Sequence, residues 1–360
     1  MLRPLLEKTL RPILVEAGAG FDVAVVRLAQ ELAKRGNPRR EDVRGRRAYL
    51  DTVAAAYGAI DPARFYAKPP PIEHLGLARV RDLPGGRGGE VVDWSWASGW
   101  TCARDDQRAK WERWRENATV HVRWFRHRDR KAPAIICVHG YRAGTFSFEE
   151  RAFGAAWLYQ LGLDVALFTL PFHALRAPVH RRGTPLFPTA DVARTNEALG
   201  QAMWDLRRLV DRAREDGAPH VGVMGMSLGG YTTSLLATVE PSLDFAVPFI
   251  PVADLTDVVV DHEALRGVRV PQELIEAGKR AMALVRPLSR RPVVSGDRVL
   301  VVGGAADRIT RAAHADALAA HFGCEQVTFP GAHLLQFGRR EGFAAIAKFL
   351  ARLGVIGPKR

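Results

Sequence analysis

The segment 225–229 reads "GMSLG" and fits the pattern G-x-S-x-G, with Ser227 at its centre. The stretch before it, "HVGVMG", is apolar like a buried strand, and "GGYTTSLLATVE" after it has the character of a helix. Glycines two positions on either side of the serine leave room for a sharp turn that presents the hydroxyl. The sequence therefore predicts that Ser227 is a nucleophile and that the backbone N–H of Leu228 helps to hold an oxyanion.

A serine nucleophile needs a base and an acid that orients the base, and in a strand–turn–helix of this kind both follow the serine, acid first. Asp307 follows the strand-like "RVLVVGGAA", and His333 lies in a glycine-bounded loop after "CEQVTF". We therefore predict that Asp307 fixes the imidazole tautomer of His333, which takes the proton from Ser227. Asp254, in "IPVADLTD", is the alternative acid because it also follows a strand.

His139 lies in "ICVHGYRAG", after an earlier strand, and is an alternative base. A His-Gly turn at this point more often shapes the second half of an oxyanion hole, so the backbone N–H of Tyr141, or that of Arg142, is the predicted second donor. Substrate-lining positions are predicted at this turn, beside the serine and in the loop after the next strand: His139, Arg142, His173, Arg176 and Met226. The basic side chains among them would favour a substrate that carries a carboxylate or phosphate.

Eight apolar runs of strand length alternate with helical stretches from about residue 90 onward. The first two runs alternate polar and apolar residues and resemble an antiparallel pair, whereas the later ones are continuous, as in parallel strands covered on both faces. This alternation predicts an α/β domain over 90–355, with a mostly parallel, eight-stranded sheet and helices on both faces. The long segment 252–296 is expected to form a helical cap over the site.

Residues 1–80 are expected to form an N-terminal helical extension and a connector. Helices are predicted over 21–38, where Phe21, Val25, Leu28 and Leu32 recur at helical spacing, and over 40–60. The segment 61–89 is rich in proline and glycine and is expected to be irregular. These N-terminal helices would pack on the body, contact a second copy in a homo-dimer, or form a lid.

The segments "HGYRAG", "GMSLGG", "GGAADRIT" and "PGAH" together resemble the α/β-hydrolase superfamily over residues 90–355. The segments "LPFHALRAP" and "GMSLGGY" are also similar to the α/β-hydrolase domain-containing protein 18 group. The resemblance implies hydrolysis of a carboxylic ester, thioester or amide through an acyl-enzyme, with no cofactor and no metal. The oxyanion turn departs from many lipases and esterases because it lacks their run of glycines.

The composition limits the other function classes. The net charge of +13 comes mostly from arginine, but the arginines are scattered and no nucleic-acid motif accompanies them, so we expect no specific nucleic-acid partner. No apolar run reaches the length of a membrane span. Three widely separated cysteines and an N-terminus without a signal-peptide pattern favour the cytoplasm.

Three functions fit these observations. A serine esterase acting on a small-molecule acyl substrate is the leading hypothesis. An acyltransferase would use the same three residues, with an alcohol or thiol in place of water. A non-catalytic, hydrolase-like binding protein would not need all three residues, so the predicted triad of Ser227, Asp307 and His333 argues against it.

Overall fold

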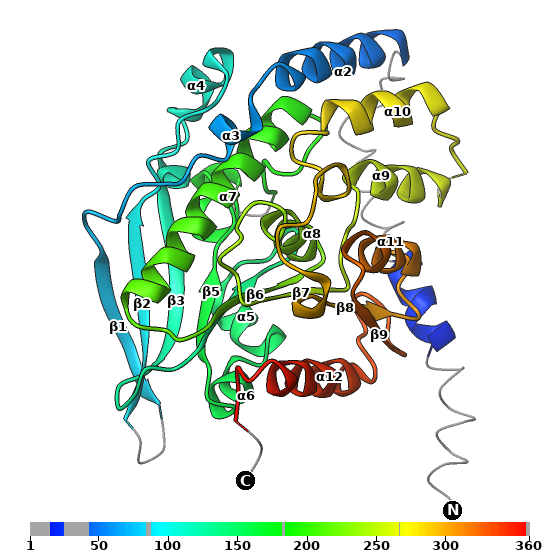
Figure 1. Ribbon diagram of the computed structural model, residues 1–360. Coiled ribbons are helices and arrows are strands. Elements are labelled where there is room, and N and C mark those ends of the chain that lie inside the picture. Colours follow the sequence, from blue (N-terminus) through cyan, green and yellow to red (C-terminus); the bar gives the residue numbers. More distant parts are fainter. Residues whose placement is uncertain (1–14, 25–42, 84–87, 182–183, 266, 358–360) are drawn as a thin grey trace, which may run out of the picture.

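A nine-stranded mixed sheet forms the centre of the computed structural model, which describes residues 15–24, 43–83, 88–181, 184–265 and 267–357 (Figure 1). The strand order is β1-β2-β3-β5-β4-β6-β7-β8-β9. The strands are β1 Gly76–Leu83, β2 Gly89–Ala97, β3 Thr119–His127, β4 Ala134–Val138, β5 Asp164–Phe168, β6 Val221–Met226, β7 Phe245–Phe249, β8 Leu300–Gly304 and β9 Glu325–Phe329.

The residue pattern of each strand matches its place in the sheet. β4, with the sequence "AIICV", is buried along its whole length, and β4 to β9 pair in parallel. Strands β1, β2, β3 and β5 pair antiparallel at the other end of the sheet. Continuous apolar runs are typical of strands with both faces covered, which explains why the central strands were recognisable in the sequence.

Helices cover both faces of the sheet (Figure 1). One large apolar cluster includes side chains of α7, α8 and α11, and a second includes those of α6 and α12 on the opposite face. The α/β fold class is therefore confirmed. The helices are α2 Val43–Gly58, α3 Pro62–Phe65, α4 Asp105–Trp111, α5 Phe146–Ala152, α6 Ala155–Gln160, α7 Val192–Glu215, α8 Leu228–Leu236, α9 Leu255–Ala264, α10 Gln272–Ala281, α11 Ala312–Phe322 and α12 Arg339–Arg352.

The predicted connector differs from the structure at one end. Residues Gly76–Leu83 form β1, an edge strand antiparallel to β2, so the described sheet has nine strands rather than eight. The first seven residues of β1 are exposed, which means that no alternation of buried and exposed residues marks this strand. Backbone pairing with β2, a long-range property, makes it a strand.

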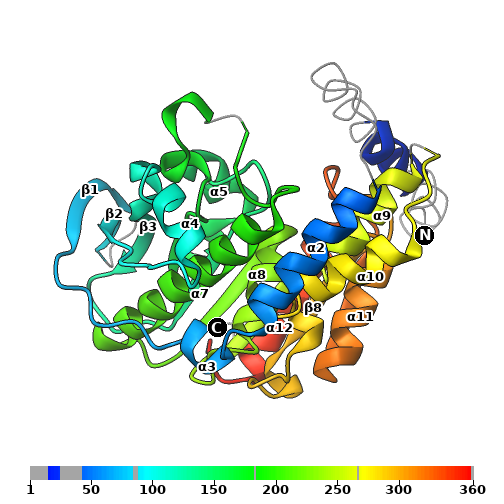
Figure 2. The same cartoon turned by 90° about the horizontal axis from the view of Figure 1, so that it is seen from above.

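The N-terminal helices pack against the body. α2 corresponds to the helix predicted over 40–60, and it lies along α10, as seen from above in Figure 2. Most of the helix predicted over 21–38 lies outside the described residues, but 15–24 is helical. Helices α9 and α10 occupy the segment predicted as a cap; that role remains a prediction.

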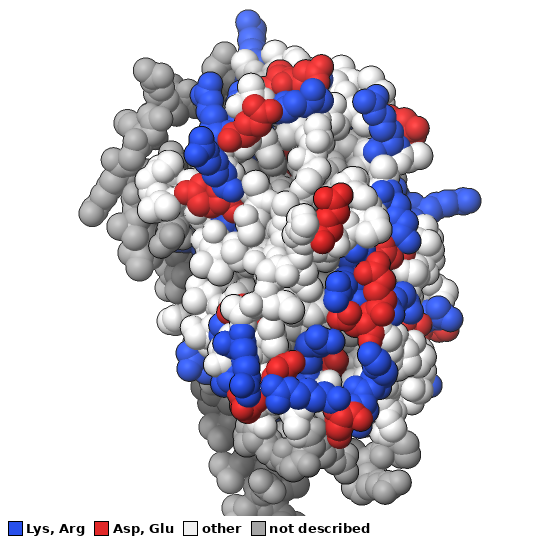
Figure 3. All heavy atoms as spheres, turned by 90° about the vertical axis from the view of Figure 1, so that its left-hand side faces the viewer, with Lys and Arg blue, Asp and Glu red and all other residues white. Residues whose placement is uncertain are grey.

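Charges of both signs are interspersed on the face drawn in Figure 3. This face is therefore no continuous basic patch. None of the helices in the described part of the chain combines the length and apolar character needed to cross a membrane. Cys102, Cys137 and Cys324 are free thiols.

Candidate active site

Ser227 occupies a strained corner between β6 and α8. Its φ of 56° and ψ of −112° are rare for a residue with a side chain. A Cβ on Gly225 would lie 2.0 Å from the carbonyl oxygen of Gly229, and one on Gly229 would lie 1.8 Å from that of Val138. Both positions therefore require glycine. Within 221–230, Ser227 is the one residue that is not buried, as expected for a corner that presents its hydroxyl.

Backbone hydrogen bonds to β7 and to the loop after it hold this corner in place. The Ser227 N–H donates to the carbonyl oxygen of Phe249 at 3.1 Å, and the N–H of Val252 donates to the Ser227 carbonyl at 3.2 Å. β6 lies between β4 and β7, at the point where the strand order reverses. Ligand sites of open α/β sheets form beyond the carboxyl ends of the strands at such a point.

His333 and Asp307 form a buried pair at the same sheet edge, after β9 and β8. The distance from His333 Nδ1 to Asp307 Oδ2 is 2.7 Å. The other oxygen of Asp307 accepts the backbone N–H groups of Ile309 at 2.9 Å and Thr310 at 2.7 Å, and the Thr310 hydroxyl donates to Oδ2 at 2.8 Å. A carboxylate fixed as an acceptor places the imidazole proton on Nδ1, which leaves Nε2 able to accept a proton.

The electrostatics favour a charged imidazolium at His333. Burial alone would lower the pKa of His333, but the charge and hydrogen bond of Asp307, together with the charge of Asp22, outweigh it and raise this pKa above its usual value. The pair can therefore take up a proton from a nucleophile and stabilise the resulting cation.

Asp254, the alternative acid, is engaged elsewhere. Its side chain caps α9 by accepting the Thr256 N–H at 2.8 Å, and it forms an ion pair with Arg286. The carboxylate that the structure brings to His333 is that of Asp307.

The turn after β4 lies directly against the serine. A Cβ built on Gly140 would be 3.4 Å from the Cβ of Ser227 and 3.9 Å from its Oγ. Tyr141 follows at once, and Leu228 begins α8, where first-turn N–H groups lack intrahelical acceptors. The arrangement fits the predicted oxyanion donors, Leu228 and Tyr141, whose role remains a prediction.

His139 is buried and both of its ring nitrogens have partners. Nε2 accepts the N–H of Leu170 at 3.0 Å, and Nδ1 lies 2.7 Å from the carbonyl oxygen of Gly140. Burial and the nearby charge of Arg176 outweigh the Gly140 hydrogen bond and lower the His139 pKa to about 4. His139 therefore shapes the turn and is not placed to act as the base.

The remaining substrate-lining predictions divide by burial. Arg142 is exposed, with a φ of 61°. Met226 is 8% exposed and joins the apolar cluster of α6 and α12, and His173 is fully buried. The full burial of His173 does not fit its predicted place among the substrate-lining residues. Arg142 is the basic residue of this set that reaches the surface.

Arg176 was also predicted to line the substrate site, and the structure buries it instead. Its side chain is 0% exposed and forms a 2.8 Å ion pair with Asp205, which is also 0% exposed. It donates as well to the carbonyl oxygens of Thr169 at 3.2 Å and Asn117 at 3.0 Å. Its guanidinium is therefore bound within the protein, between the loop after β5 and α7.

We expect Arg176→Met to lower the free energy of unfolding by about 3–5 kcal/mol, because it leaves the Asp205 carboxylate buried without its cation. Adding Asp205→Asn should restore much of the loss. Arg108→Met, which removes an exposed pair with Asp105, should change it by less than about 1 kcal/mol. Urea denaturation followed by tryptophan fluorescence measures all three. If Arg176→Met were as stable as the parent and had an altered ester preference, the predicted substrate-lining role of Arg176 would be supported instead.

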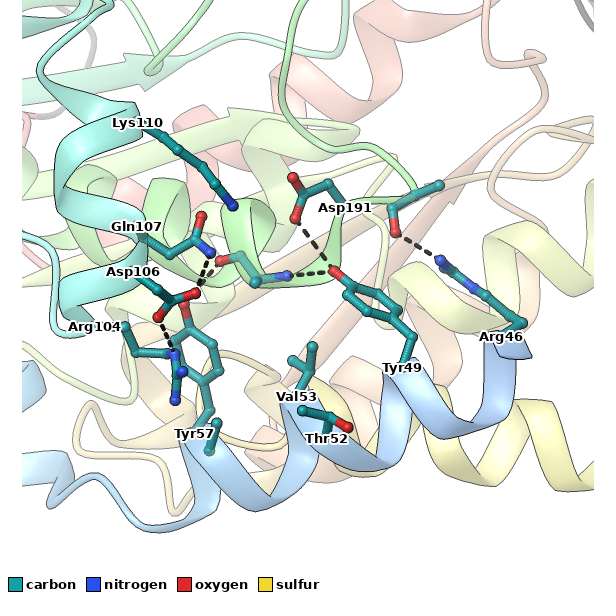
Figure 4. A pocket seen from close by; sticks show the side chains of 13 residues that line it. Arg46, Tyr49, Thr52, Val53, Tyr57, Arg104, Asp106, Gln107, Lys110 and Asp191 are labelled. Atoms are coloured by element: carbon teal, nitrogen blue, oxygen red, sulfur yellow. Dashed lines mark hydrogen bonds and ion pairs between the residues drawn. The ribbon is translucent and has the colours of Figure 1, made fainter. Parts of the chain in front are cut away.

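A separate pocket of about 400 Å³ lies between α2, α4 and the start of α7, and contains none of the residues discussed above (Figure 4). Several of its polar groups bond to one another or to the backbone beside it. Tyr49 donates to Asp191 at 3.2 Å and accepts the Ala193 N–H at 3.2 Å, while Arg46 donates to the carbonyl of Ala190 at 2.9 Å. These contacts join α2 to α7.

Sequence reasoning missed two residues beside the pair. Thr310 bonds Asp307 and lies 3.2 Å from His333 Nδ1; its place three residues after Asp307 was a local signal for a turn. Asp22 accepts the backbone N–H of His333 at 2.8 Å from 311 residues away in the chain, and no local pattern could have linked the two.

Residues 114–266 match the model of the family described as alpha/beta hydrolase domain containing 18. Over 304 residues the chain is 28% identical to the uncharacterized protein Rv2627c of Mycobacterium tuberculosis (strain ATCC 25618 / H37Rv), covering 83% of this chain and 72% of that protein. An acetyl xylan esterase from Paenibacillus sp. R4 superposes with a TM-score of 0.56 at 12% identity, covering 87% of this chain and 96% of that chain. Sheet order, glycine-flanked corner and family match agree that the protein has the α/β-hydrolase fold, and residues 114–266 are similar to an α/β-hydrolase family.

Proposed function

We propose that the protein is a serine hydrolase that cleaves a carboxylic ester, or a thioester or amide, through an acyl-enzyme. Ser227 is the nucleophile, His333 the base and Asp307 the acid. The observation that carries the proposal is the combination of a strained, glycine-flanked serine with a hydrogen-bonded His–Asp pair at one sheet edge. The family match over residues 114–266 and the likeness in fold to an esterase support it.

The first half of the reaction forms the acyl-enzyme. As Ser227 Oγ bonds to the acyl carbon, its proton passes to Nε2 of His333, and the carbonyl oxygen takes the negative charge. The backbone N–H groups of Leu228 and Tyr141 hold that oxyanion. The imidazolium, stabilised by Asp307, then gives its proton to the leaving oxygen as the bond from carbon to that oxygen breaks.

The second half repeats these steps with water. His333 takes a proton from the water as it bonds to the acyl carbon, and the proton returns to Ser227 Oγ when the acid leaves. The same chemistry with an alcohol or thiol in place of water would be acyl transfer.

Labelling with a fluorophosphonate, followed by peptide mapping, tests the proposal. We expect one label per chain, on Ser227, and turnover of esters in a panel of graded acyl length that begins with acetate. Products are analysed with and without an added alcohol, so that predominant transfer to the alcohol would identify an acyltransferase. Absence of both labelling and ester turnover in the folded protein would refute a serine hydrolase.

A further inference from the structure

The helical residues 15–24 dock on the two loops that carry Asp307 and His333 (Figure 1). Val15, Gly18, Ala19 and Asp22 recur at the spacing i, i+3, i+4 and i+7, so they share one helix face. Ala19 packs with Ala306 and Ala332, which directly precede Asp307 and His333. The small residues let the helix approach closely, since a Cβ on Gly18 would lie 3.0 Å from the Cβ of Ala332.

The Asp22 carboxylate, at the end of this face, joins the two loops. One oxygen accepts the backbone N–H of His333 at 2.8 Å and that of Arg308 at 3.2 Å, and the other accepts the N–H of Leu334 at 3.1 Å. Asp22 is 0% exposed. A buried carboxylate is costly unless strong hydrogen bonds compensate, and three N–H donors from two loops do so here.

We propose that Asp22 is a positioning residue of the active site. Its carboxylate links the loop after β8, which carries Asp307, to the loop after β9, which carries His333, and so fixes the two side chains relative to each other. This inference rests on the proposed function for its catalytic meaning. The N-terminal extension thereby has a role beyond packing, because it supplies the contact that the loops after β8 and β9 share.

The charge of Asp22 also acts on the base. Asp307 hydrogen-bonds the ring, the Thr310 hydroxyl lies 3.2 Å from Nδ1, and His262 of α9 is close enough for its charge to interact with His333. Among these groups, Asp307 and Asp22 favour the imidazolium and raise the His333 pKa against the effect of burial. Loss of the Asp22 charge should therefore lower this pKa.

Asp22→Asn tests this link between the two loops. Glu16→Gln is the matched control because Glu16 is an exposed carboxylate on the same helix. The base must be neutral to act, so kcat/KM of the parent should fall as pH drops through a His333 pKa above its usual value. In Asp22→Asn this acid limb of the pH profile of kcat/KM should move to lower pH. At the pH plateau above it, kcat should fall about 10- to 100-fold, because Asp307 and His333 are no longer held in position relative to each other. Glu16→Gln should match the parent in both.

Amide hydrogen exchange gives a readout that does not need turnover. The peptides that contain Arg308 and 333–334 should exchange faster in Asp22→Asn than in the parent or in Glu16→Gln. The ring titration of His333, followed by NMR, should shift downward in the same variant.

Gly18→Leu tests the docking without a charge change, in case Asp22→Asn fails to fold. Its control is Gly20→Leu, because a Cβ on Gly20 meets nothing within 4 Å. The leucine at position 18 should push the helix off the loops, speed the same amide exchange and lower kcat, while the one at position 20 should do neither.

The outcomes separate the two proposals. Parent-like kinetics, titration and exchange in Asp22→Asn would overturn the positioning role of Asp22, while labelling of Ser227 would still support the serine hydrolase. Lower stability with an unmoved acid limb and unchanged kcat would reduce Asp22 to a structural residue. Without labelling of the parent the hydrolase fails, and the exchange and ring titration still decide whether Asp22 holds the two loops.

Discussion

Ser227→Ala is expected to abolish fluorophosphonate labelling and to lower ester turnover on the order of 10⁴-fold or more, since the reaction loses its nucleophile. The protein should remain folded. The strain of this corner lies in the backbone, at a φ of 56°, and alanine meets it with a side chain no larger than serine. The Ser227 backbone bonds to Phe249 and Val252 do not involve the hydroxyl.

Ser234→Ala is the matched control, because it removes a hydroxyl from α8, the helix that directly follows Ser227. That hydroxyl donates to the Gly230 carbonyl at 2.8 Å and has no part in the proposed chemistry. Labelling and turnover of this variant should equal those of the parent. If Ser227→Ala still labels at full stoichiometry, another residue is the nucleophile and the site assignment is wrong.

The sequence could predict the centre of the fold because its signals there are local. Each parallel strand is a continuous apolar run, and the two glycines that mark the Ser227 corner lie within five residues of sequence, although the atom that excludes a side chain at Gly229 belongs to Val138 of β4. The order of Asp307 and His333 after the serine follows from the strand order. The structure then adds what spacing could not, a 2.7 Å contact between them.

The edge strand β1 and the burial of charged side chains were harder to predict from the sequence, because both depend on partners that are distant in the chain. β1 is a strand through its pairing with β2, and Arg176 is buried through its pairing with Asp205 on α7. A loop arginine has the same local appearance whether it meets solvent or a buried carboxylate.

The N-terminal helix shows a third difficulty. Its apolar repeat was expected to include Phe21, yet Phe21 is 44% exposed, and the face that docks bears Gly18, Ala19 and Asp22. Small residues bury little area but permit close approach, so the hydrophobic periodicity that predicted a helix over 21–38 did not indicate the docking face over 15–22.

Asp307→Asn should lower kcat on the order of 10⁴-fold through the wrong imidazole tautomer. The structure gives the reason. Oδ1 already accepts two backbone N–H groups, from Ile309 and Thr310, and an asparagine would keep its oxygen there. Its NH₂ would then face His333 Nδ1, which must become an acceptor. The proton would move to Nε2, where it blocks removal of the proton from Ser227.

Asp254→Asn is the matched comparison, and steady-state kinetics of both variants distinguish the two acids. Asparagine caps a helix about as well as aspartate, so α9 should keep its N-cap. The loss of the ion pair with Arg286 should lower stability and leave kcat within about tenfold of the parent, because that pair does not touch His333. A severe loss at Asp254 with little loss at Asp307 would transfer the acid's role to Asp254. The Asp307–His333 hydrogen bond would then be a structural contact, and the base would be oriented from the loop after β7 instead of the loop after β8.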